Sequence, residues 1–335
     1  MKQSLFPRPR YWAQAAEQNK RPRGIFGLTM TLLIMMLIAS LIESFVSGLI
    51  LSGVILIRHS DEALALVSSG PISLDDASKW LVSMTPDWFF YVMLFCEIFM
   101  IFTVMIYCTK IEKRKMATLG LIRRHCVREY LLGAVIGAVL FSGVFFLGKA
   151  AGAYKVGAWQ YSPRLLIMLC IGFLGYMVQG AAEELMIRGF FAVSMNKRYP
   201  TAFCVLMSSL LFAMFHLGNN ASGFLPILNT FLVGLFLCMY ILKRGSIWGS
   251  FAIHSVWNFT QGFIFGFPVS GLPAGDCLIR PLIRQYNDFT TGGEYGPEGG
   301  ICTTIILLAA LIAVFALKPR GEIVPEEKPK IEKAE

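Results

Sequence analysis

The sequence has little charge, and this shortage identifies the broad class of the protein. Only 15% of its 335 residues are Asp, Glu, Lys or Arg, whereas 56% are hydrophobic. A soluble globular protein carries about a quarter charged residues. Several apolar runs reach the length of about 20 residues that a helix needs to cross a hydrocarbon core of about 30 Å. The sequence therefore predicts an all-α, polytopic integral membrane protein, a bundle of about eight transmembrane helices.

Familiar catalytic signatures are absent as well. No G-x-S-x-G elbow supports a serine nucleophile, and no H-E-x-x-H, P-loop or G-x-G-x-x-G pattern occurs. The eight cysteines form no C-x-x-C pair, and most are typical of small buried hydrophobes. Cys277 and Cys302 flank one loop and could pair if it faces an oxidising compartment. No cleavable signal peptide is expected, because the first apolar run far exceeds an h-region.

The apolar runs define the predicted organisation of the chain. The eight expected spans lie at residues 25–57, 88–108, 130–148, 165–190, 201–217, 224–242, 247–267 and 301–317. The expected units are a basic segment at 1–24, two spans with an extracytoplasmic loop at 25–109, a core of five spans at 110–267, a Gly/Pro-rich extracytoplasmic loop at 268–300, the last span at 301–317 and a disordered tail at 318–335. Tyr11 and Trp12 are expected to be interfacial anchors.

Basic connections alternate with acidic or uncharged ones along this order. The Lys/Arg excess falls on residues 1–24, 109–129, 191–200 and 243–244 and on the tail. Because Lys and Arg concentrate on the cytoplasmic side, the net charge of +9 predicts topology rather than nucleic-acid binding. Both termini are therefore expected in the cytoplasm. The compact loops favour a bacterial cytoplasmic membrane.

Two adjacent carboxylates and an arginine interrupt the fourth apolar run. Charged groups at membrane depth cost about 2.5–3.5 kcal/mol each on insertion scales, so they are rare and usually functional. Glu184 and Arg188 are four residues apart and share a helix face. Glu183 lies about 100° further around the helix and could serve as a general base. The alternative is a purely structural Glu–Arg pair.

Two of the four histidines lie in later apolar runs. His216 ends the fifth span, where a bond to a backbone carbonyl is the structural alternative. His254 and Asn258 lie four apart on one face and could either join helices or aim two donors at an oxyanion. Together with the glutamates they predict one hydrolytic site. With the spans above, however, Glu183 and His216 would differ in depth by about 19 Å, so a shared site requires different helix boundaries.

These motifs have a familiar order. Glu183-Glu184-x-x-x-Arg188, Phe212-x-x-x-His216 and His254-x-x-x-Asn258 lie on successive apolar helices. The set resembles the CPBP family of intramembrane proteases, which includes CAAX-prenyl endopeptidases of the Ras-converting type and Abi-like bacteriocin-processing and immunity proteins. The resemblance covers about residues 110–265 and marks the predicted core at 110–267 as the catalytic unit.

The resemblance implies an intramembrane endopeptidase that cleaves membrane-associated polypeptides within the lipid bilayer, and the naming of the family favours a metalloprotease. Its substrates would be CAAX-like proteins or leader and bacteriocin-type peptides. Glu183 would activate water with help from His216, whereas Glu184 and Arg188 would be structural or orienting.

The resemblance further implies that His254 and Asn258 stabilise the tetrahedral oxyanion. The cofactor stays open at this point. Glu183, His216 and His254 could supply three ligands to a divalent metal such as zinc, with a fourth position free. The same glutamate and histidine could also activate water without a metal.

Two other functions remain as alternatives. A non-catalytic immunity or scaffold protein of the same fold would not need the carboxylate and imidazole groups. A proton-coupled transporter would use Glu43, Glu97 and Glu183 as a relay. Glu43 and Glu97 have no His or Arg partner at helical spacing, so they are interpreted as packing or cavity residues.

Overall fold

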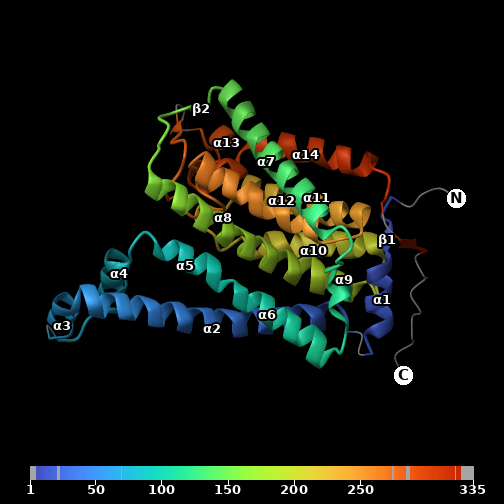
Figure 1. The fold of residues 1–335 in the computed structure, drawn as a ribbon, viewed down its shortest axis with the longest axis horizontal. Helices are drawn as coiled ribbons and strands as arrows, with labels where there is room; N and C mark the ends of the chain where they lie inside the picture. Colours follow the sequence, from blue (N-terminus) through green and yellow to red (C-terminus); the bar gives the residue numbers. More distant parts are fainter. Residues whose placement is uncertain are drawn as a thin grey trace.

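The computed structural model describes residues 5–20, 23–68, 70–273, 275–283, 287–320 and 322–325. Helices make up most of this part of the chain, and its strands form only two pairs of two residues each. Figure 1 shows the helices packed side by side, with both described ends of the chain at one end of the bundle. The predicted all-α class is confirmed.

The helices follow the predicted apolar runs. The longer ones are α2 (Ile25–Arg58), α7 (Cys126–Ala150), α8 (Pro163–Glu184), α10 (Thr201–Phe215), α11 (Phe224–Arg244), α12 (Trp248–Phe259) and α14 (Ile301–Ala316). The second predicted span forms α5 (Phe89–Cys96) and α6 (Ile98–Ile106). Three π-helical segments extend helices: η1 (Tyr107–Ile111) after α6, η3 (Leu185–Ala192) after α8 and η4 (Thr260–Ile264) after α12.

Short elements complete the fold. The short α-helices are α1 (Arg10–Gln18), α3 (Ser60–Ser68), α4 (Leu74–Met84), α9 (Val193–Met195) and α13 (Asp288–Thr291). The 3-10 helices are η2 (Met116–Leu119), η5 (Gly293–Tyr295) and η6 (Pro297–Gly299). Strand β1 (Arg8–Pro9) pairs antiparallel with β4 (Ile323–Val324), and β2 (Tyr154–Lys155) pairs antiparallel with β3 (Leu282–Ile283).

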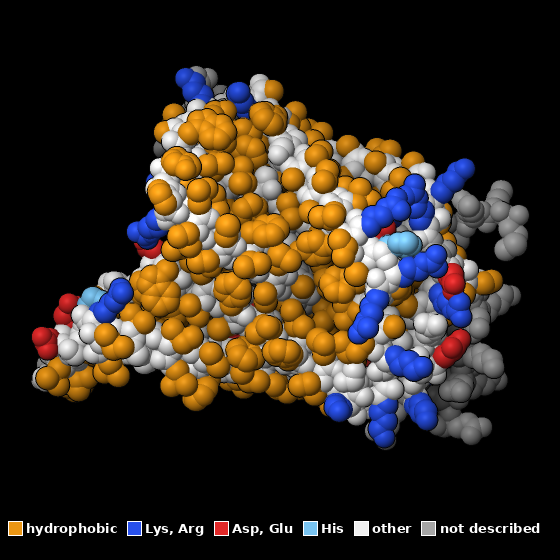
Figure 2. All heavy atoms as spheres, viewed as in Figure 1, with side chains coloured by type: hydrophobic (Ala, Val, Ile, Leu, Met, Phe, Trp, Pro, Cys, Tyr) orange, Lys and Arg blue, Asp and Glu red, His pale blue; other side chains and the backbone are white. Residues whose placement is uncertain are grey.

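Five helical stretches among the described residues are long and apolar enough to cross a membrane: Ile25–Arg58, Phe89–Ile111, Cys126–Ala150, Pro163–Met195 and Phe224–Arg244. α10 and α14 are apolar but shorter. In Figure 2 hydrophobic side chains cover the middle of the molecule, and Lys and Arg gather mainly at its right-hand end. These features identify an integral membrane protein, and all eight predicted apolar runs contain a helix.

Glycines bring the central helices into close contact. α12 packs between α7 and α8. A Cβ atom on Gly137 of α7 would lie 2.5 Å from the carbonyl oxygen of Ile253, and one on Gly180 of α8 would lie 2.5 Å from Ser255 Oγ. Small residues allow such backbone approach, which favours helix association in membranes. The glycines therefore place α12 directly beside the helix with the glutamate pair.

The fourth span is longer than predicted. α8 continues through η3 and α9 and ends at Met195, not at residue 190, and its last turns are buried, with α9 packed against α1. At 1.5 Å per residue, Glu183 lies about 18 Å from Met195, and His216 lies about 22 Å from Thr201 at the start of the next helix. Glu183 and His216 are therefore at similar depth. The predicted difference of about 19 Å is wrong.

Two expectations about the chain ends are also wrong. Tyr11 and Trp12 are buried inside the protein rather than placed at a lipid interface, because α1 packs against η2 and α9. The predicted disordered tail is ordered in its described part, where β4 pairs with β1 and Glu322 pairs with Arg10. Residues 326–335 of that tail lie outside the described residues.

The predicted loops contain more structure than their sequences suggested. α3 and α4 occupy most of the connection between the first two spans, and α13, η5 and η6 lie in the loop at 268–300. Cys277 and Cys302 are both buried and free, so the disulfide considered above is not formed.

The close helix contact can be tested with an alanine substitution. Gly137→Ala places a methyl group against the Ile253 carbonyl and should reduce the free energy of unfolding in micelles by about 1–3 kcal/mol. Gly48→Ala on α2 is the matched control, because apart from the adjoining backbone of its own helix no atom lies within 4 Å of its added Cβ. Since alanine is the better helix former by about 1 kcal/mol, this control should not destabilise. Equal effects of the two substitutions would contradict the packing argument.

Candidate functional site

A buried ion pair lies at the centre of the candidate site. Glu184 and Arg188 are both fully buried, and Arg188 Nη1 lies 2.6 Å from Glu184 Oε1. Ser250 Oγ on α12 donates to the second carboxylate oxygen, Oε2. The spacing of four residues predicted this pair. Glu184 is therefore engaged with Arg188 and with α12 and does not face open space.

His254 lies between the two adjacent glutamates. Its Nδ1 is 3.2 Å from Glu184 Oε1, and its Nε2 is 3.8 Å from Glu183 Oε2. Because a carboxylate oxygen can only accept, Nδ1 carries a hydrogen and donates to Glu184. The neighbouring carboxylates thus contact opposite nitrogens of one imidazole. Glu183, which is half-buried, is the one left outside the ion pair.

Gln179 connects Glu183 to Asn258. Its side-chain Nε2 donates to Glu183 Oε1, and its Oε1 accepts from Asn258 Nδ2 at 3.1 Å. Glu183 Oε2 has no hydrogen-bond partner among the described residues. The amide of Asn258 retains a second hydrogen, since each amide nitrogen carries two. One oxygen of Glu183 is therefore held in place while the other remains available.

His216 approaches the same region from α10. Its Nδ1 donates to the backbone carbonyl of Phe212 at 2.8 Å, which is the structural alternative considered for this residue. The Phe212 ring contacts both imidazoles, with centroids 4.7 Å from His216 and 6.0 Å from His254. The same ring faces Arg188, whose Cζ lies 4.3 Å from its centroid. The donation from Nδ1 leaves Nε2 of His216 as an acceptor.

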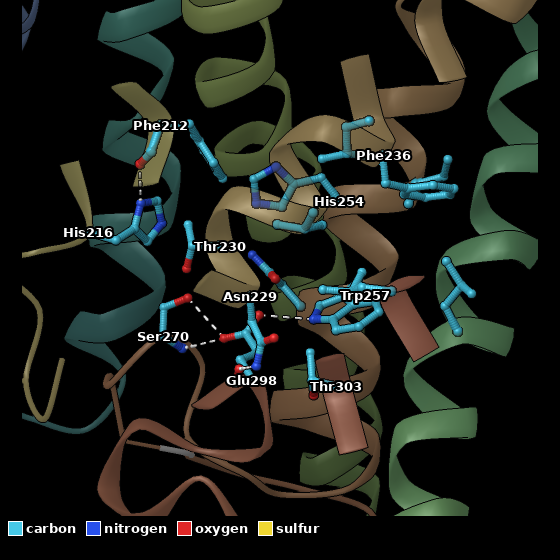
Figure 3. Close-up of a pocket in the computed structure, with 16 residues that line it drawn as sticks. Phe212, His216, Asn229, Thr230, Phe236, His254, Trp257, Ser270, Glu298 and Thr303 are labelled. Carbon is cyan, nitrogen blue, oxygen red and sulfur yellow. Dashed lines mark hydrogen bonds between the residues drawn. The ribbon is translucent and has the colours of Figure 1, made fainter. Parts of the chain in front are cut away.

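Both histidines line one cavity of about 40 Å³ (Figure 3). Asn258 also lines it, with apolar side chains from α7, α11 and α14. One water needs about 10–15 Å³ of such volume and two or more polar partners, so this cavity can hold water. The structure thus brings together Glu183, Glu184, Arg188, His254 and Asn258 by direct or bridged contacts. It brings His216 to the cavity that His254 and Asn258 line, without a direct contact to Glu183.

The loop at 268–300 contributes a carboxylate to this cavity. Glu298 Oε1 accepts from Trp257 Nε1 at 2.9 Å, and its Oε2 accepts from the backbone N–H and the hydroxyl of Ser270 at 2.8 and 2.9 Å. These bonds appear at the lower side of the cavity in Figure 3. The prediction that placed this loop outside the core therefore missed one wall of the site.

Other side chains around the site were also missed. Gln179 precedes Glu183 by four residues and Ser250 precedes His254 by four, so helical spacing carried a signal for both. Glu298 had no such signal, because its contact depends on how the loop folds. Glu97, interpreted above as isolated, lies within electrostatic range of Glu183 and of Glu43.

The candidate metal ligands do not form a metal site in this arrangement. No group of three His, Cys, Asp or Glu side chains in the described part of the chain is placed to hold a metal ion. Glu183 and His254 are close. The Nδ1 bonds of His254 to Glu184 and of His216 to its own helix leave Nε2 of each ring open, as in histidines that bind a metal. Glu183, His216 and His254 keep the donor atoms of a three-ligand set, but the structure does not place the three close enough together to hold an ion.

The ion pair yields a test of stability. Glu184→Gln leaves Arg188 as an unpaired buried charge and should reduce the free energy of unfolding by about 3–5 kcal/mol, as measured by unfolding in micelles. The double variant Glu184→Gln/Arg188→Met removes that charge and should recover part of the loss. A double variant no more stable than the single one would show that the unpaired charge is not the cause.

Residues 163–260 match the protein-family model described as type II CAAX prenyl endopeptidase, Rce1-like. The match extends from α8 to the start of η4 and contains all six predicted site residues. It confirms the resemblance to the CPBP proteases over this region. No curated protein and no solved structure matches the chain.

Proposed function

We propose that this chain, whose residues 163–260 match the type II CAAX prenyl endopeptidase family, is an intramembrane endopeptidase. The observation that carries the proposal is the approach of Glu183 Oε2 to His254 Nε2 at 3.8 Å, beside a water-sized cavity. The substrate would be a membrane-associated polypeptide, either CAAX-like or of the leader or bacteriocin type. The basic end of the bundle, with both termini, would face the cytoplasm of a bacterium.

Glu183 acts as the general base in this proposal. Gln179 fixes one of its oxygens, and Oε2 takes a proton from a water held beside His254, at the edge of the cavity. The water oxygen then attacks the carbonyl carbon of the scissile peptide bond. When the tetrahedral intermediate collapses, the same carboxyl group returns the proton to the leaving amine, and the C–N bond breaks.

His254 and Asn258 supply the oxyanion donors. An imidazolium at His254 would balance the two glutamates together with Arg188, and a neutral group of four is less costly in a membrane than a net charge. Its Nδ1–H remains on Glu184, so Nε2–H is free to donate to the developing oxyanion. The second amide hydrogen of Asn258 can donate beside it.

His216 assists in positioning the water. Because its Nδ1–H is held by the Phe212 carbonyl, Nε2 presents a lone pair on the side of the cavity. A water held by this lone pair and by Glu183 would be oriented for attack. This role requires no proton on Nε2, in contrast to that of His254.

One observation favours a second candidate, the proton-coupled transporter. Glu97 lies within electrostatic range of both Glu43 and Glu183, so these carboxylates form a row from α2 to α8. Such a row could pass protons towards Glu183.

Two substitutions separate these functions. Glu183→Gln should reduce cleavage of a prenylated CAAX-type peptide or a leader-type membrane peptide in proteoliposomes by about 10²–10⁴-fold, because the general base is lost. Glu43→Gln is the matched control within the membrane and should leave cleavage within about twofold, whereas a relay would lose proton flux with either variant. Cleavage that survives Glu183→Gln would overturn the protease mechanism. Unfolding curves establish that both variants are folded.

A further inference from the structure

A second cavity, of about 590 Å³, lies at the basic end of the bundle and shares no lining residue with the cavity of the candidate site. We call it the basic cleft. Its walls come from β1 and α1, from η2, the start of α7 and the connection between them, from the end of α11 and from the segment before β4. Lys and Arg side chains are concentrated at this end in Figure 2.

The basic cleft contains more positive than negative charge. Two of its arginines are neutralised: Arg244 by Glu129, with contacts of 2.8 and 2.5 Å, and Arg10 by Glu322. Arg124 and Arg320 also line the cleft, and neither has a carboxylate partner among the described residues. The cleft therefore keeps two uncompensated guanidinium groups, which suit an anion with several acceptor oxygens.

A buried phenol lacks an acceptor in the same cleft. Tyr11 lines it with only 2% of its surface exposed, and its hydroxyl has no hydrogen-bond partner in the described part of the chain. The neighbouring Trp12 Nε1 can only donate, so it could not accept the phenolic hydrogen. Burial raises the pKa of Tyr11, which keeps this hydrogen in place at neutral pH. A buried donor without an acceptor is costly, and a bound anion would satisfy it.

An apolar stripe leads from the basic cleft along α7. His125, which precedes α7, lines the cleft and adopts a left-handed backbone conformation with φ of 61°. The exposed side chains Val127, Leu131, Val135 and Val139 then follow at intervals of four, so they share one face of the helix. In a membrane this face contacts lipid tails, and the cleft lies where their headgroups would be.

We propose that the basic cleft binds the phosphate group of an anionic membrane phospholipid, with one acyl chain along the stripe of α7. Arg124 and Arg320 contact the phosphate oxygens, and the Tyr11 hydroxyl donates to one of them. Free inorganic phosphate has the same charged oxygens but no chain for the stripe. The binding of lipid does not depend on the proposed protease activity.

Lipid binding to the full chain can be measured by native mass spectrometry from micelles, with phosphatidylglycerol and the zwitterionic phosphatidylcholine as probes. Phosphatidylglycerol should bind more tightly. Arg124→Gln should weaken it by about fivefold, the factor expected for one arginine near anionic lipid. Tyr11→Phe, which keeps the buried ring, should weaken it by about tenfold because a hydrogen bond to a charged group is lost. Arg123→Gln is the matched control, since this exposed neighbour does not line the cleft.

Each outcome decides a part of the proposal. If Arg123→Gln and Arg124→Gln weaken phosphatidylglycerol binding equally, only the general surface charge attracts the lipid, and the proposed binding site is overturned. Equal binding of the two lipids, or full binding by Tyr11→Phe, would overturn it as well. Inorganic phosphate at millimolar concentration should not displace phosphatidylglycerol. If phosphate does displace phosphatidylglycerol from the unmodified protein but not from Arg124→Gln, the ligand of the cleft is the free anion, and the lipid proposal is overturned.

Discussion

Arg188 carries a positive charge inside a bundle that is buried in lipid, and the surrounding structure compensates that charge. Glu184 supplies the counter-charge from the same helix, and the carboxylate in turn receives donors from Ser250 and His254 of α12. The face of Phe212 covers the guanidinium and also contacts the imidazoles of both site histidines. One charge thus fixes the relative positions of α8, α10 and α12. Without this charge, the three helices would lose the shared contacts that hold the side chains of the site together.

Small residues and π-helical segments complete this arrangement. The glycines on α7 and α8 bring α12 close enough for its histidine to reach both glutamates. The π-helical segments η3 and η4 follow the site residues of α8 and α12, and such segments often occur at functional sites. With α9, η3 lengthens α8 to a stretch of 33 residues, more than a membrane span needs, whereas η4 extends α12 only to Ile264. The glutamates of α8 can therefore lie in the middle of the bundle while both ends of this stretch reach the interfaces.

Much of the site was predictable from local spacing. The i, i+4 relations gave the Glu184–Arg188 pair and the shared face of His254 and Asn258, because a helix fixes those neighbours without reference to the rest of the fold. The depth of His216 was not predictable, since it depends on where the preceding helix ends, and apolar composition alone does not mark that point. Glu298 was missed for a related reason: its bonds to Trp257 and Ser270 arise only after the loop folds back onto the bundle.

The pairing of β1 with β4 has a consequence for topology. Hydrogen-bonded strands must lie on the same side of a membrane, so the chain between Arg8 and Val324 crosses it an even number of times. The five stretches of full spanning length give an odd number. If all five cross, an odd number of the shorter segments, among them α10, α12 with η4, and α14, must cross as well. Whether the number of crossings is even or odd therefore follows from two short strands outside the membrane, a feature that a hydropathy profile does not detect.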